Sequence, residues 1–274
     1  MNRGLFVFLV PACLFMCAIF LLPLLLVVYT SFGGPEPTLA SYAELVSRPL
    51  YVNVLWNTLQ ISAASTLATV LLAYPIAYHL ARQTPRRRAL LLILVLLPFW
   101  TSILVKSFAF TVLLGNSGTL NSLVTALFGD GARVKLLFNR PAVLIGMTHY
   151  LAPFAVFSIL ASLLAQNPEL RRAAEIMGAG RLRIFLTITL PLSLPGVLAG
   201  ALLAMILSMG MFVTPALLGG RTDLMVSNLV DFHVHETLDW NAASALAVCL
   251  IVVTGLLAGL LSLVRPGQLV GGEA

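Results

Sequence analysis

The sequence predicts an all-α membrane protein with six transmembrane helices. Of its 274 residues, 59% are apolar and only 9% are charged, whereas a soluble globular domain carries about 25% charged residues. A helix that crosses a bilayer needs about 20 predominantly apolar residues, and six stretches of the chain are long enough. We therefore expect a single transmembrane domain over 1–274, with no separate soluble domain.

The six helices are predicted in stretches with few or no acidic or basic residues. The first stretch is over twenty residues long and lacks a small-x-small cleavage site near its end, so we expect a retained helix rather than a signal peptide. The third contains Lys106, and its apolar part ends near Leu114. The predicted helices cover 5–30, 52–81, 89–114, 141–165, 186–218 and 240–264.

Prolines interrupt these stretches unusually often. In a membrane bundle, the carbonyl groups that proline releases can bond to neighbouring helices or to water in a cavity. Two interpretations stay open, because simple kinks and a bundle bent around a pathway would use the same residues. The prolines concerned are Pro11, Pro23, Pro75, Pro98, Pro153, Pro191, Pro195 and Pro215.

The charges indicate an orientation and exclude some partners. The net charge is +6, but the basic residues are too few and too dispersed for a nucleic-acid-binding stripe. With the N-terminus inside, the inner segments hold ten basic residues and the outer segments five, and four of the ten lie within 82–88. Cytoplasmic segments carry such an excess. We therefore expect both termini in the cytoplasm.

A short helix is predicted between the fourth and fifth spans, over 168–178. Asn167 is suited to cap its N-terminus, Pro168 suits the first helical position, and Glu169 is favoured at the positive end of the helix dipole. Gly178 is placed to end the helix in a left-handed turn. One face of this helix consists of Leu170, Ala173, Ala174 and Met177.

This face of small and apolar residues allows two interpretations. An isolated helix of this length is marginally stable in water, so its face could enter a groove on a partner protein. Alternatively, the helix could lie on the membrane surface. The residues that follow favour the first interpretation.

The segment from 166 to 196 resembles the EAA motif of ABC importer permeases, in which Glu-Ala-Ala is followed by Gly and later by a hydrophobic-x-Leu-Pro sequence. Arg172 occupies the acidic first position of the motif, and Glu175 lies three residues further on. The matching residues are Ala173, Ala174, Gly178, Ile188, Leu190 and Pro191. The resemblance implies that this helix, a coupling helix, contacts an ATPase through Leu170, Ala173, Ala174, Met177, Gly178, Leu190 and Pro191.

Four further segments, 57–82, 96–110, 136–154 and 212–220, are similar to the first permease subunit of spermidine/putrescine importers. This resemblance implies the type I ABC importer permease (MetI-like) fold and a non-catalytic subunit. It also implies a second permease, two cytoplasmic ATPase subunits that use ATP and Mg, and an extracytoplasmic solute-binding protein. The chain has no Gly-x-x-x-x-Gly-Lys-Ser/Thr loop, so we expect no ATP hydrolysis by the chain itself.

The resemblance implies a small charged solute, with a polyamine favoured over an aminophosphonate, an opine or iron. All ten acidic residues lie outside the apolar stretches, so we expect no buried carboxylate. Lys106 has the wrong sign for a polyamine and could snorkel to the outer interface or form a gate. Aromatic faces can bind cations but can equally serve packing. The candidates for the translocation path are Phe99, Trp100, Lys106, Tyr150, Phe154 and Phe212.

The remaining candidates belong to the outer segments. His233 and His235 could present two metal ligands from an extended segment, although no further ligand pattern accompanies them. We expect the loops 31–50 and 219–240 to face a binding protein instead. Two other classes of protein are considered. A secondary transporter driven by an ion gradient would need buried acidic residues, and a membrane scaffold would not need the helix at 168–178.

Overall fold

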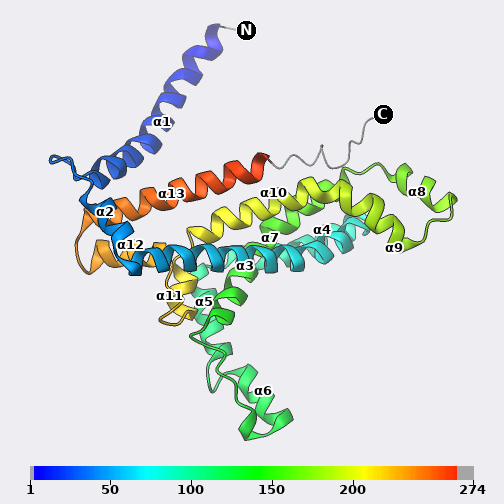
Figure 1. Ribbon diagram of the computed structural model, residues 1–274. Coiled ribbons are helices and arrows are strands. Elements are labelled where there is room, and N and C mark those ends of the chain that lie inside the picture. The colour runs from blue at the N-terminus through cyan, green and yellow to red at the C-terminus, as the bar shows by residue number, and fades with distance from the viewer. Residues whose placement is uncertain (1–2, 264–274) are drawn as a thin grey trace. The chain divides into compact units, whose positions relative to one another are not determined.

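The computed structural model describes residues 3–263, with the side chains of 10–11, 13–129 and 131–260. Position 264, the predicted end of the sixth helix, lies outside the described residues, as do both chain termini. Within 3–263 the chain is helical and has no strand (Figure 1). It divides into two compact units, Met1–Leu55 with Val226–Val253 and Trp56–Met225 with Thr254–Ala274.

The first unit is built around the N-terminal turns of helix α3. Its core consists of Tyr51, Val54, Val226, Leu229 and Leu246. The helices that contribute to this unit are α1 (Arg3–Ser31), α2 (Ala40–Ser47), α3 (Pro49–Ala81), α12 (Val226–His235) and α13 (Trp240–Leu263).

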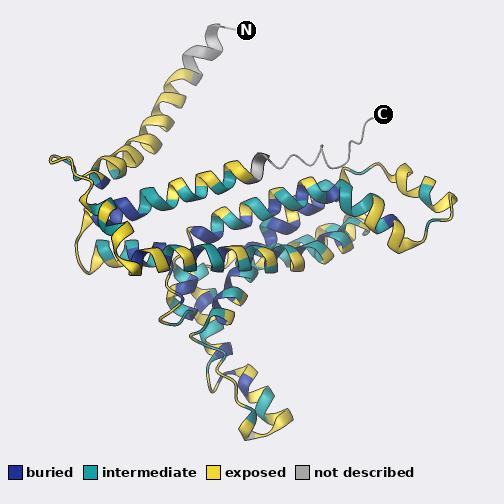
Figure 2. Ribbon diagram, in the orientation of Figure 1, coloured by how far each residue is buried: buried dark blue, intermediate teal, exposed yellow. Residues whose placement is uncertain are grey.

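Helix α1 exposes nearly all of its described side chains (Figure 2), and only Ser31 is buried among them. An exposed helix that is apolar on all sides is stable only against lipid or a partner helix. We therefore expect α1 to face one of these surroundings.

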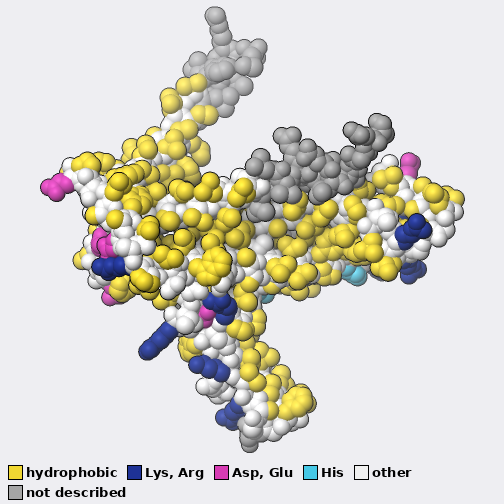
Figure 3. Space-filling view, viewed as in Figure 1, with side chains coloured by type: hydrophobic (Ala, Val, Ile, Leu, Met, Phe, Trp, Pro, Cys, Tyr) yellow, Lys and Arg dark blue, Asp and Glu magenta, His cyan; other side chains and the backbone are white. Residues whose placement is uncertain are grey.

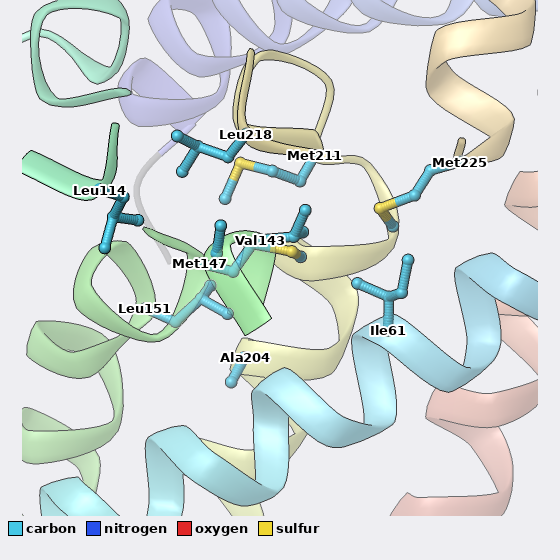
Figure 4. Packing of buried hydrophobic residues seen from close by; sticks show 10 residues of the cluster. Ile61, Leu114, Val143, Met147, Leu151, Ala204, Met211, Leu218 and Met225 are labelled. Carbon is cyan, nitrogen blue, oxygen red and sulfur yellow. The ribbon is translucent and has the colours of Figure 1, made fainter. Parts of the chain in front are cut away.

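The second unit contains the remaining helices and has α7 at its centre. Its elements are the rest of α3, α4 (Pro85–Leu96), η1 (Leu97–Trp100), α5 (Ile103–Leu114), α6 (Thr119–Phe128), η2 (Asp130–Ala132), α7 (Arg140–Leu164), α8 (Pro168–Ile176), α9 (Arg181–Ile184), η3 (Phe185–Thr189), α10 (Leu190–Met209) and α11 (Val213–Leu218). Figure 4 shows Val143, Met147 and Leu151 of α7 beside Leu218 and Met211 in the main core.

Close packing of α7 against α10 depends on a glycine. A Cβ atom at Gly196 would lie 2.4 Å from Ser162 Cβ and 2.7 Å from the Ser158 carbonyl oxygen. The Ser158 hydroxyl donates a hydrogen bond of 2.9 Å to the Gly196 carbonyl. The two backbones therefore approach as small-residue membrane helices do.

Six described helices are long and apolar enough to cross a membrane, as the sequence predicts. Their bounds are Cys13–Ser31, Pro49–Ala81, Ile103–Phe128, Arg140–Leu164, Arg181–Met209 and Trp240–Leu260. The predicted continuous helix 89–114 is wrong, because the chain turns at η1 and becomes extended at Thr101. Pro98 has no amide hydrogen to continue the α-helix, and the Thr101 hydroxyl bonds to the Pro98 carbonyl at 2.8 Å.

The predicted continuous helix 186–218 is also interrupted. The five-residue stretch η3 is a π-helix, and α10 ends at Met209 before Gly210. The chain resumes as α11 at Val213, with Pro215 in the first turn, where a missing amide hydrogen costs no intrahelical bond. The segments expected as loops contain the helices α2 and α12.

Candidate functional site

Helix α8 forms as the local signals predict. The Asn167 side chain accepts a hydrogen bond of 2.9 Å from the Glu169 amide, which satisfies one of the free donors at the helix start. At the other end Gly178 adopts φ +78°, in the left-handed region. The amides of Gly178 and Ala179 donate to the carbonyls of Glu175 and Ala174, both at 3.0 Å, which is a Schellman motif.

The apolar face of α8 is uncovered in this chain. No residue of the helix is buried, and Leu170 and Met177 are 48% and 86% exposed. Ile176, which the sequence pattern did not single out, is 87% exposed beside the helix end. Within the part of the chain that the structure describes, nothing buries these apolar side chains.

The end of α7 and the link between α7 and α8 are hydrogen-bonded to η3 and the first turn of α10. The Gln166 amide donates to the Thr189 carbonyl in η3 at 3.0 Å. The Ser162 hydroxyl donates to the Leu192 carbonyl at 3.3 Å, beside the predicted residues Leu190 and Pro191 in the first turn of α10. These two bonds connect the end of α7 and the link to α8 with η3 and α10.

Four of the six path candidates meet in one cluster. The Lys106 Nζ lies 5.0 Å from the centroid of the Tyr150 ring and donates a hydrogen bond of 2.8 Å to the Pro98 carbonyl. The Phe154 ring is 5.6 Å from that of Phe99 and 5.9 Å from that of Tyr150. Phe99, Lys106, Tyr150 and Phe154 thus join η1, α5 and α7, and we call them the Lys106 cluster.

The other two candidates are not members of this cluster, although Trp100 directly follows Phe99 in η1. Trp100 is 72% exposed at the end of η1, and Phe212 is 37% exposed at the start of α11. Neither ring takes part in the ring contacts of the Lys106 cluster that the described residues make. The path candidates thus divide into the Lys106 cluster and two aromatic residues that are not part of it.

Asp223, whose side chain is only 4% exposed, is a buried carboxylate that the sequence does not predict, but it lies outside the six candidate spans and is paired with Arg140. Its Oδ1 lies 3.2 Å from Arg140 Nε, and its Oδ2 accepts from the Gly220 amide at 3.0 Å. Arg140 also donates to Gln60 at 2.9 Å and to Asn57 at 3.0 Å. Asp223 follows a Gly-Gly pair in a polar stretch, and nothing in that local pattern signals burial.

The extended segment proposed for two histidines is instead the helix α12. His233 Nε2 lies 3.1 Å from the Tyr51 hydroxyl, and His235 Nδ1 lies 3.0 Å from Asp231 Oδ1. Within the part of the chain that the structure describes, no three His, Cys, Asp or Glu residues are grouped so that they could hold a metal. The hypothesis of a metal site on an extended segment is therefore wrong, because the two histidines lie on a helix.

The six apolar helices and the exposed helix between the fourth and fifth spans define the class of a transport permease, and comparison with known proteins gives the family. Residues 67–267 match the family described as binding-protein-dependent transport system inner membrane component. The chain belongs to this family.

Curated relatives and solved structures agree with that assignment. The chain is 34% identical to the spermidine/putrescine transport system permease protein PotB of Escherichia coli (strain K12) over 244 residues, 86% of this chain and 88% of PotB. Its identity to PotB of Haemophilus influenzae is also 34%, over 80% of this chain and 77% of that one. A chain of the bacterial alginate ABC transporter superposes with a TM-score of 0.78 at 21% identity, covering 94% and 92% of the two chains. The fold is thus that of a type I ABC importer permease.

Proposed function

We propose that this subunit forms half of the translocation path of an ATP-driven importer for a polyamine such as spermidine or putrescine. The choice of solute is supported by the PotB relatives, whose alignments cover most of both chains. The observation that carries the proposal is the helix α8, capped by Asn167 and ended by Gly178, with its apolar face exposed. A helix of this kind fits a groove on an ATPase subunit.

The assembly that we propose contains a second permease, two cytoplasmic ATPase subunits and an extracytoplasmic solute-binding protein. ATP and Mg are bound by the ATPase subunits, because this chain lacks a phosphate-binding loop. Both chain termini lie in the cytoplasm, which places α8 on the ATPase side. The excess of basic residues in the inner segments supports this orientation.

Coupling in this proposal runs from α8 to α10. The face of Leu170, Ala173, Ala174 and Met177 enters the ATPase groove, and Gly178 sets the direction in which the chain leaves it. The Gln166 bond to Thr189 and the following Leu190–Pro191 pair transmit the movement to α10. Rigid contacts are needed here, because packed elements switch between discrete arrangements rather than deform continuously.

The path along this subunit is proposed to pass the Lys106 cluster, with contributions from Trp100 and Phe212. The faces of Tyr150, Phe99 and Phe154 can attract a passing cation. Lys106 already uses its charge on the Pro98 carbonyl and the Tyr150 ring. Both partners are uncharged, so Lys106 keeps its positive charge; the contacts fix the position of the ammonium but do not remove its repulsion of a polycation.

The test is uptake by reconstituted transporter. This subunit, its partner permease and the ATPase are incorporated into vesicles with the cognate binding protein outside and ATP inside. Labelled spermidine or putrescine should accumulate only with ATP, and ferric iron or an aminophosphonate should not compete. Accumulation of a competitor instead of the polyamine would overturn the solute, and uptake without ATP would overturn the mechanism.

A further inference from the structure

A polar groove lies where α8 meets the ends of two membrane helices. Its volume is about 300 Å³, and it is lined by the last turn of α3 and the residue after it, the end of α7, the link to α8, the first turn of α8 and the stretch η3. Arg82 and Arg171 both line the groove. All lining residues belong to one compact unit, so the groove is a feature of that unit alone.

Both arginines keep most of their hydrogen-bonding capacity. The Arg82 guanidinium lies over the Tyr78 ring at 4.0 Å and donates one bond to the Tyr78 hydroxyl. Arg171 donates one bond of 2.9 Å to Glu175. A guanidinium has five N–H donors, so each side chain is fixed by one bond within the described residues and can still direct donors at a ligand.

The surroundings of the groove carry a surplus of positive charge. The segments 82–88 and 166–184 contain eight arginines and two glutamates. Glu175 is paired with Arg171, and Arg88 caps the end of α3 by donating to the Leu80, Ala81 and Gln83 carbonyls. Figure 3 shows some of the Lys and Arg side chains near α8 and α9 (labelled in Figure 1) and others elsewhere on the molecule. The groove therefore favours an anion.

The position and lining of the groove identify the kind of anion. Two candidate membrane spans end here, at Ala81 and Leu164, and the ends of such spans lie at the depth of lipid headgroups. Leu164 lines the groove while 44% exposed, beside the apolar side chains of Leu163 and Ile188. An amphiphile with a phosphate headgroup matches both the apolar and the basic parts of this lining.

We propose that this groove binds the phosphate headgroup of an anionic phospholipid, held between Arg82 and Arg171. Guanidinium groups bind phosphate oxygens through paired, charge-assisted hydrogen bonds. The headgroup then touches both the end of α3 and the start of α8. This site is separate from the apolar face of α8, and the proposal goes beyond the transport function, because lipid binding is measured without any solute.

The experiment measures phospholipid binding to the assembled, delipidated transporter by native mass spectrometry and thermal shift. Phosphatidylglycerol should bind saturably and raise the unfolding temperature, while phosphatidylcholine with the same acyl chains should not. Arg82→Gln and Arg171→Gln should each weaken phosphatidylglycerol binding roughly tenfold, the equivalent of one charge-assisted hydrogen bond. Arg172→Gln is the matched control on α8, because Arg172 does not line the groove, and it should bind as the unchanged protein does.

Four outcomes would overturn the proposal. Equal binding of phosphatidylcholine would remove the charge requirement, and equal binding by Arg82→Gln, Arg171→Gln and Arg172→Gln would remove the site. An equal thermal shift with sn-glycerol 3-phosphate would show that a free phosphate suffices. Binding that occurs only after the ATPase is stripped away would assign the groove to an acidic side chain of that partner.

Discussion

Lys106 is held by groups of its own chain and does not extend freely towards the surface. Its ammonium bonds to the Pro98 carbonyl at 2.8 Å and faces the Tyr150 ring. The Pro98 carbonyl lies at the end of η1, where a cation also offsets the negative end of a helix dipole. The side chain therefore bridges the break between η1 and α5.

Lys106→Met should retain membrane insertion and leave uptake within a few fold, while lowering the stability by about 1–3 kcal/mol through loss of a charged hydrogen bond. Lys106→Arg should restore much of the loss. The measurements are thermal unfolding of the purified complex and uptake by vesicles. A collapse of uptake in a Lys106→Met complex of unchanged stability would instead make Lys106 a gate.

Arg140 and Asp223 form an ion pair in which only the carboxylate is buried. The Arg140 side chain is 38% exposed, whereas that of Asp223 is 4% exposed. Arg140→Gln leaves a buried carboxylate without its partner and should cost about 3 kcal/mol, the lower end for broken buried pairs. Asp223→Asn should cost less, because Arg140 keeps Gln60 and Asn57 as acceptors.

The comparison is made by thermal unfolding, with Arg221→Gln as an exposed control close to Asp223 in the sequence. The double variant Arg140→Gln/Asp223→Asn should be more stable than Arg140→Gln alone. If Arg140→Gln and Arg221→Gln unfold at the same temperature, the ion pair contributes nothing.

At the scale of the element, α8 is the helix whose role can be tested most directly. Ala174→Asp places a charge on the apolar face, and Gly178→Val forces a β-branched residue into a left-handed conformation at a cost of about 1–2 kcal/mol. No heavy atom lies within 4 Å of a Cβ added at Gly178, so the strain is confined to the backbone. Both variants should abolish uptake and weaken ATPase recruitment, with membrane insertion preserved.

The decisive measurement is co-purification of the ATPase with each variant, together with uptake. Arg172→Gln is again the matched control, because it lies on the opposite side of α8 from the apolar face. Normal recruitment and uptake by both Ala174→Asp and Gly178→Val would contradict the coupling role.

The elements differ in how far their sequences predict them. The cap at Asn167, the small-residue face and the turn at Gly178 are local signals, so the predicted helix 168–178 matches α8 closely. The Arg140–Asp223 pair joins residues 83 positions apart, and a local pattern cannot predict it. The break after Pro98 was missed because the same residue also fits a kink, and the bonds that stabilise the break come from side chains further along the chain.

At the scale of the whole molecule, the apolar surface is far larger than a soluble protein would tolerate. Leucine, phenylalanine and valine side chains are exposed along the candidate spans, so the described chain is stable only with lipid or partner helices around it. This requirement was predictable from composition, since 59% of the residues are apolar. In the proposed assembly a second permease covers part of this surface, and its residues belong to another sequence.

The orientation of the chain gives the last prediction. The proposed contacts with both partners depend on this orientation, because the ATPase must reach α8 from one side of the membrane and the binding protein must reach the segment between α11 and α12 from the other. Single cysteines at Arg86 and Arg221 report on opposite sides, and both positions are exposed. Cys13, Cys17 and Cys249 are first replaced by Ala or Ser, so that only the introduced cysteine can react with the thiol reagent.

In intact cells, Arg221→Cys should react with an impermeant thiol reagent, and Arg86→Cys should react only after the membrane is opened. The reason is the excess of arginine in 82–88, which is costly to translocate and is therefore retained in the cytoplasm. Both variants should react fully once detergent is added, which controls for local accessibility. The reverse pattern would place α8 outside the cell, where no ATP-driven subunit could bind it, and both the orientation and the coupling proposal would then be wrong.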